Sequence, residues 1–240
     1  MKKIKVGFLP FYIKLYDDSN PHYRDPMVDY SNMMVHMLES QGLEVIKADE
    51  VCRIKPEFER AVEKFNREDV AAVITQHLAY SPSLESIDAL LTLKAPIIVL
   101  DTTVDYDLIR SANIERRISA NHGIHGVQDM CNLLKRNGKP YYICAGHALH
   151  SEVISETAGM CRAAAAAKAY QNARVGSVGG SFTGMGDFLV SDERYQNDIG
   201  ATVAYMTPEI SAAYVAKVTE EEVDAEIALD REKYTRLKVW

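Results

Sequence analysis

The segment SANHGIHGVQD, residues 119–129, holds two histidines and an aspartate at helical spacing. On a helix, His122, His125 and Asp129 lie within about 60° of one another, opposite an apolar stripe that begins at Val127. This position argues against a buried core histidine and leaves three interpretations open: a solvated polar face, a metal-ligand set or a substrate-binding edge. Two histidines and a carboxylate can bind a transition metal, but so short a motif indicates a metal site only weakly.

Aromatic side chains follow the first apolar run of the chain, in the segment GFLPFYIKLYDD, residues 7–18. If that run is a strand of an open α/β sheet, Phe11, Tyr12 and Tyr16 emerge near its carboxyl end, where ligands of such sheets bind. A tyrosine there can stack on the apolar face of a sugar and form a hydrogen bond with a hydroxyl group. The alternative is that these rings only cover the end of a helix.

Glycines are concentrated in GSVGGSFTGMGDF, residues 176–188, directly after another apolar run. The segment has neither G-x-G-x-x-G nor the P-loop pattern, so it lacks the residues that define a dinucleotide or nucleoside triphosphate site. Its glycines let backbone N–H groups approach a ligand closely, and Phe182, Met185 and Phe188 could line an apolar side of a pocket. A simple strand-to-helix turn explains the glycines as well.

The elements that must position these residues alternate along the chain. Short runs rich in β-branched and aromatic residues predict strands buried on both faces, as in a parallel sheet. Amphipathic segments between them predict helices, and this order predicts an open doubly wound sheet of the flavodoxin or Rossmann type. The predicted strands are 4–11, 43–48, 70–76, 96–102 and 141–146, and the predicted helices are 28–40, 56–66, 83–93 and 126–136.

The later part of the chain changes in pattern. We predict a flavodoxin-like α/β domain over residues 1–150, a connecting helix over 151–171, and part of a second α/β domain, incomplete, over 172–240. That last part has only two clear strand patterns, too few for a core of its own. It also has a predicted helix whose first residues, Thr219 and Glu222, match a capping box.

The composition of the chain argues against two classes of binding partner and indicates the cellular compartment. The net charge is 27 − 34 = −7, without a basic block, which argues against nucleic acid or an anionic membrane as partner. The four cysteines show no C-x-x-C pair, so we expect reduced thiols and a cytoplasmic protein. Cys144 with His147 alone is a poor metal-ligand set.

Four stretches together resemble the amino-terminal half of the L-arabinose isomerase and L-fucose isomerase family, in order along essentially the whole chain. The resemblance implies an aldose–ketose isomerase that acts on a small sugar, usually with Mn²⁺, and assembles as a homo-oligomer with sites shared between subunits. It also implies that the metal ligands lie outside these 240 residues, which alone would have little or no isomerase activity. The stretches are TQHLAYSP (75–82), NHGIHGVQDM (121–130), RVGSVGGSFTGMGDF (174–188) and TPEISAAYVAKVTEEEVDAEI (207–227).

The resemblance implies substrate-binding roles for Phe11, Tyr12, His122, His125 and Met185, and no catalytic or metal-binding residue in this chain. His125 would act in the site of a neighbouring subunit. His122 stands where the arabinose enzymes usually have a glutamine, which leaves the choice of sugar open. Asp129 is then expected to be a first-turn acid favoured by the helix dipole rather than a ligand. The competing hypothesis is a non-catalytic sugar- or nucleotide-binding α/β module.

Overall fold

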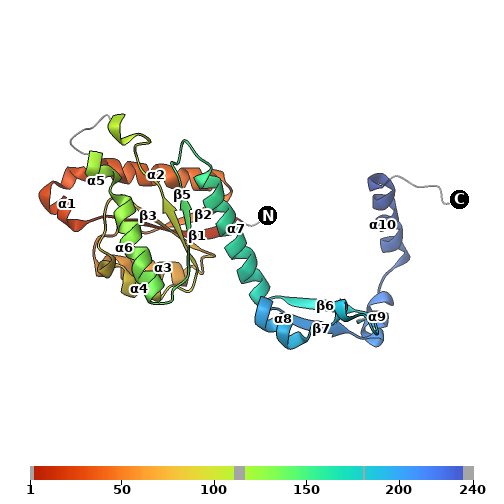
Figure 1. Cartoon of the computed structure of the whole chain (residues 1–240). Coiled ribbons are helices and arrows are strands. Elements are labelled where there is room, and N and C mark those ends of the chain that lie inside the picture. The colour runs from red at the N-terminus through yellow and green to blue at the C-terminus, as the bar shows by residue number, and fades with distance from the viewer. Residues whose placement is uncertain (1–2, 111–116, 181, 235–240) are drawn as a thin grey trace. The chain divides into compact units, whose positions relative to one another are not determined.

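The computed structural model describes residues 3–110, 117–180 and 182–234 (Figure 1). It divides into two compact units, Met1–Lys168 and Ala169–Trp240, and the boundary between them falls within α7 (Val153–Gln171). Within the described residues no helix is long and apolar enough to cross a membrane.

The first unit is built on a five-stranded parallel sheet in the order β2-β1-β3-β4-β5. This order confirms the predicted doubly wound α/β fold. The three inner strands are buried almost without interruption, which is why their sequences are continuously apolar instead of alternating. The strands are β1 (Ile4–Phe11), β2 (Leu43–Lys47), β3 (Val73–His77), β4 (Ile97–Asp101) and β5 (Tyr141–Ala145).

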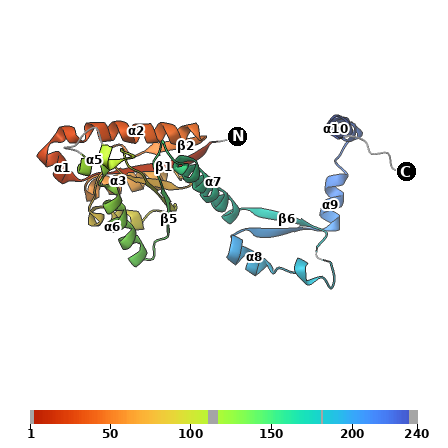
Figure 2. The same ribbon diagram turned by 45° about the horizontal axis from the view of Figure 1, so that its top comes forward.

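Helices cover both faces of this sheet, α2 on one side and α3 and α6 on the other (Figure 2). Along β1, Leu9 and Phe11 join the core beneath α3, α4 and α6, while Val6 and Phe8 join the core beneath α2 and α7. The two cores follow directly from the two-residue period of a strand. The helices of this unit besides α7 are α1 (Lys14–Ser19), α2 (Asp25–Ser40), α3 (Lys55–Arg67), α4 (Ile87–Leu91), α5 (Arg117–Asn121) and α6 (Gly123–Arg136), with short 3₁₀ turns at η1 (Pro21–Tyr23), η2 (Ser83–Glu85) and η3 (Leu108–Arg110).

Helix α6 begins three residues before the predicted start at 126. Gly123 and Gly126 are buried on the face that packs against the end of β3. A Cβ atom at Gly123 would overlap the backbone carbonyl oxygen of His77, and one at Gly126 would lie 2.5 Å from Cδ2 of the same histidine. These glycines therefore do not break the helix: they allow it to pack directly on β3.

The second unit has a parallel pair of strands, β6 (Arg174–Val178) and β7 (Thr202–Met206). Its helices are α8 (Asp192–Ile199), α9 (Pro208–Val215) and α10 (Glu220–Lys233), with a 3₁₀ turn, η5 (Gly186–Phe188). Side chains cap each helix, and the predicted capping box of Thr219 and Glu222 is confirmed at the start of α10. Of the described residues in this unit, only Ala201 is buried.

We expect Gly123→Ala to lower the free energy of unfolding of the first unit by about 1–3 kcal/mol, because the new methyl group must displace backbone atoms of β3. Gly159→Ala is the matched control, since a Cβ there meets only Arg162 Nη2 at 3.9 Å. That variant should gain up to about 1 kcal/mol from helix propensity in α7. Urea denaturation measures both values, and a shift of the two variants in the same direction would contradict this account.

Candidate functional site

The sheet order places a topological switch point between β1 and β3, because the chain leaves these neighbouring strands toward opposite edges of the sheet. Ligands of open α/β sheets bind beyond the carboxyl ends of strands at such a point. The end of β1 at Phe11 pairs there with the end of β3 at His77. Helix α1 follows β1, and the first turn of α6 packs on the end of β3.

Four polar rings meet at this edge and form what we call the His122 cluster: Tyr16, Tyr80, His122 and His125. The His122 and His125 ring centroids are 4.5 Å apart, and Tyr80 lies 5.7 Å from His122. The Tyr16 hydroxyl is 3.5 Å from His122 Nδ1, the outer limit of a hydrogen bond. The structure thus brings together the two histidines that the sequence singled out.

The histidines of the cluster differ in their surroundings. His125 is exposed, whereas His122 is half-buried. Partial desolvation, together with the neighbouring His125, lowers the pKa of His122 below its ordinary value. His122 is therefore neutral at pH 7, with one ring nitrogen that donates and one that accepts. This pairing suits a hydroxyl group, which also donates and accepts.

Phe11 and Tyr12 lie beneath the cluster and not on its surface. Phe11 is fully buried and stacks on His77 at 4.3 Å between ring centroids. Tyr12 is 2% exposed and belongs to a small core with Met27, Val51 and Leu78. Its ring meets Tyr16 edge-on at 6.0 Å. Both side chains thus support the cluster from below, and direct contact of either one with a sugar stays a prediction.

Met185 lies in the second unit, 42% exposed, between Gly184 and η5. Gly179, Gly180 and Gly184 have φ angles of +89°, +70° and +85°, which explains why this turn requires glycine. Phe182 is exposed, and the side chain of Phe188 lies outside the described residues. The contact of Met185 with a sugar also stays a prediction.

The prediction for Asp129 was wrong. The residue lies in the second turn of α6, and the first turn contains no acidic residue. Its carboxylate accepts hydrogen bonds from the Tyr80 hydroxyl at 3.2 Å, from the Ser83 backbone N–H at 3.1 Å and from the Ser83 hydroxyl at 2.9 Å. Asp129 therefore fastens the segment after β3 to α6 and fixes Tyr80 beside His122.

Sequence reasoning missed His77, on which this edge is built. The ring lies between Phe11 and the glycine face of α6, and neither ring nitrogen has a hydrogen-bond partner. Complete burial lowers the pKa of His77 to about 3, while the charge of Asp129 opposes this shift. The signal that could have revealed the position is the G-x-x-G spacing, which leaves one face of α6 without side chains.

A second group of rings lies at the carboxyl ends of β4 and β5, and the sequence singled out only His147 among its members. Tyr106 lies 5.4 Å from His147 and 4.4 Å from His150, measured between ring centroids. The backbone occupies both nitrogens of His147: Nδ1 accepts from Leu149 N–H, and Nε2 lies 3.4 Å from the Val104 carbonyl oxygen.

The described side chains do not fit a metal site. Over residues 3–110, 117–180 and 182–234, no three His, Cys, Asp or Glu residues are placed so that they could hold one ion. His122 and His125 lack the carboxylate that would complete a triad, because Asp129 is bound to Ser83 and Tyr80.

The chain matches a known protein family. Residues 24–172, more than half of the chain, match the family model described as the L-arabinose isomerase N-terminal domain. The matched segment contains His77, His122 and His125 and begins after Phe11 and Tyr12. A comparison with curated proteins found no significant match.

We expect the stability of the first unit to depend on the protonation of His77. Because burial depresses its pKa, the folded state favours the neutral ring. The stability that this neutral ring contributes to the folded state is complete above about pH 6.5 and is lost as the pH falls toward about 3. His77→Leu should remove up to about 1.4 kcal/mol per pH unit from the slope of unfolding free energy against pH in that window. Gly159→Ala, which changes no titratable group, should leave the slope as it is in the unmodified protein. A His77→Leu variant with an unchanged slope would contradict the burial of this ring.

Proposed function

Because the chain belongs to the L-arabinose isomerase N-terminal domain family, we propose that it is the amino-terminal substrate-binding and assembly portion of a metal-dependent aldose–ketose isomerase. The observation that carries this proposal is the family match across residues 24–172, which includes the strands β2, β3, β4 and β5 of the parallel sheet and the segment with His122 and His125. The substrate is a small neutral sugar.

In this proposal, His122 and His125 form hydrogen bonds with hydroxyl groups of the sugar. The half-buried, neutral ring of His122 supports such a role, since it avoids the cost of a charge facing a neutral ligand. The ring faces of Tyr16 and Tyr80 offer apolar surface for the C–H groups of the sugar. Phe11 and Tyr12 hold these groups in place. We also propose Met185 as a substrate-binding residue.

We further propose a homo-oligomer in which His125 completes the site of a neighbouring subunit. The exposure of this ring on the first turns of α6 supports that arrangement. The Mn²⁺ that the isomerase family implies would act on the sugar's carbonyl and hydroxyl oxygens. The described residues do not form a site for this ion, so its ligands are expected outside them. The proposal therefore gives the described residues a role in binding the sugar and none in binding the metal.

The second unit, in the same proposal, is part of a larger α/β domain. Parallel sheets are stable when both faces are covered, and a pair of strands is marginal alone. The strands β6 and β7 have no fully buried residue, and apolar side chains such as Val178 and Tyr205 are 70% and 59% exposed. Further strands or helices are therefore expected to cover them.

A non-catalytic sugar- or nucleotide-binding module is the second candidate, because the strand order β2-β1-β3-β4-β5 is also that of flavodoxin-like binding proteins. The family match favours the isomerase over this module. Aldose-to-ketose conversion by the complete protein that contains this chain would decide between them.

In the complete isomerase, we expect His125→Ala to lower kcat/KM for the sugar by about tenfold or more, because a hydrogen bond to the substrate is lost. The bound metal, measured by elemental analysis, should stay at the level of the unmodified enzyme. His22→Ala is the control, since this exposed histidine lies on η1 and its ring pairs with Asp25 and not with a residue of the His122 cluster.

Two outcomes would contradict the proposal. Loss of metal in His125→Ala would make the histidine a ligand, and unchanged turnover would remove it from the substrate site. The state of assembly is measured separately by molecular mass in solution, where a monomer would contradict sites shared between subunits.

A further inference from the structure

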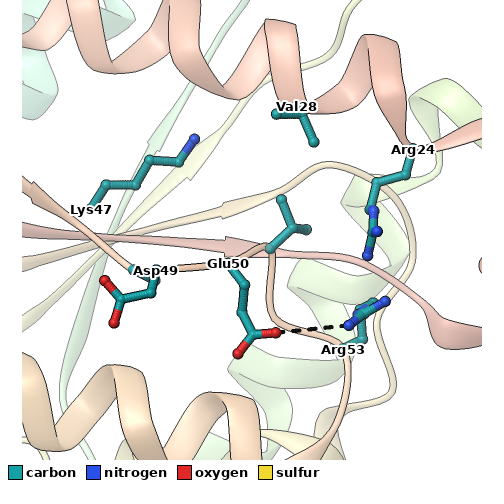
Figure 3. A pocket seen from close by; sticks show the side chains of 8 residues that line it. Arg24, Val28, Lys47, Asp49, Glu50 and Arg53 are labelled. Atoms are coloured by element: carbon teal, nitrogen blue, oxygen red, sulfur yellow. Dashed lines mark ion pairs between the residues drawn. The ribbon is translucent and has the colours of Figure 1, made fainter.

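A cavity of about 330 Å³ lies between the first turn of α2 and the segment that follows β2 (Figure 3). None of the residues of the His122 cluster lines it. Its walls combine three cationic side chains, two carboxylates and three small apolar residues. The lining residues are Arg24, Val28, Lys47, Ala48, Asp49, Glu50, Val51 and Arg53.

Lys47 is a cation without a counterion. Its ammonium donates a hydrogen bond to Asn32 Oδ1 at 2.6 Å, and it forms no ion pair with any carboxylate in the described chain. Burial lowers the pKa of Lys47 below its ordinary value, with no opposing contribution from an acid. Two of its three N–H donors remain for a ligand.

Arg24 also keeps most of its donors. In the part of the chain that the structure describes, its guanidinium forms one hydrogen bond, from Nη1 to Asp17 Oδ2 at 3.0 Å. That oxygen also accepts from Arg53 Nη1 at 2.6 Å, so the single negative charge of Asp17 is shared between two arginines. A guanidinium has five N–H groups, and Arg24 therefore has several to spare.

The carboxylates of the cavity are already paired with other cations. Asp49 pairs with Lys64, and Glu50 pairs with Arg60 and, at 3.8 Å, with Arg53, as the dashed line in Figure 3 marks. Counted with their direct partners, five cations face four carboxylates, an excess of one positive charge. The cations are Arg24, Lys47, Arg53, Arg60 and Lys64, and the carboxylates are Asp17, Asp49, Glu50 and Glu57.

We propose that this cavity binds the phosphate monoester of a small polyhydroxylated molecule, with its phosphate group between Lys47 and Arg24. These two cations stand on opposite walls (Figure 3), so the ligand must present oxygens in more than one direction. A tetrahedral phosphate does so, whereas a carboxylate has two oxygens in one plane. The amino-terminal end of α2, a helix of 16 residues, adds a favourable dipole for the anion.

The cavity has room for more than a phosphate group. At roughly 30 Å³ for each water molecule of the liquid, 330 Å³ holds several times the volume of inorganic phosphate. Glu50 and Asp49 can accept hydrogen bonds from hydroxyl groups, and Val28 and Val51 offer apolar contact to the carbon chain. This ligand differs in charge from the neutral sugar proposed for the His122 cluster, and no residue of that cluster lines the cavity, so the two binding sites are distinct.

Isothermal titration calorimetry of the 240-residue chain in phosphate-free buffer at pH 7 tests the proposal, with glycerol 3-phosphate, inorganic phosphate and glycerol as probes. We expect saturable 1:1 binding of glycerol 3-phosphate, inorganic phosphate weaker by about fivefold or more, and no heat from glycerol. Lys47→Met and Arg24→Gln should each raise the Kd for glycerol 3-phosphate by about tenfold or more. Lys135→Met removes an exposed lysine of α6 and should change nothing.

Folding does not obscure this test. Lys47→Met keeps the apolar stem and removes a charge that burial disfavours, so its unfolding midpoint without ligand should equal or exceed that of the unmodified chain. Arg24→Gln provides an independent variant on the opposite wall. The proposal is overturned if glycerol 3-phosphate does not bind, if inorganic phosphate binds as tightly, or if both variants bind as the unmodified chain does. No sugar turnover enters the measurement, so its failure leaves the proposed isomerase function untouched.

Discussion

The close packing of α6 on the end of β3 is the constraint on which the candidate site depends. With no side chain at Gly123 or Gly126, the helix approaches until its face meets the backbone and ring of His77. Phe11 closes the opposite side of that ring. Because the helix is held at this distance, His122 at its start faces Tyr16 from α1 and Tyr80 from the segment after β3.

This arrangement places polar groups where a core normally has none. Thr75, Gln76 and His77 end the central strand β3, are fully buried or nearly so, and leave side-chain atoms without hydrogen-bond partners. Each such group costs about 1–3 kcal/mol, a cost that the apolar packing around the strand must offset. Buried polar groups without hydrogen-bond partners are found most often at functional sites. Here such groups end the strand that lies beside the His122 cluster.

The sheet was predictable from sequence because strands buried on both faces carry a strong continuous apolar signal. The start of α6 was not, since glycine weakens a helix locally and only the tertiary contact with His77 explains its presence. Asp129 was misplaced for the same reason. Likewise, the burial of Tyr12 depends on distant Met27, Val51 and Leu78, and the cavity is assembled from side chains of separate segments, so no local pattern reveals either.

Helix α1 links the two sites physically. It has no buried residue and no side-chain cap at its start. Tyr16 packs against the small core around Tyr12 and reaches His122, while Asp17 accepts from Arg24 and Arg53 beside the cavity. Adjacent residues of one short helix thus depend on both sites, although the ligands that suit them differ in charge.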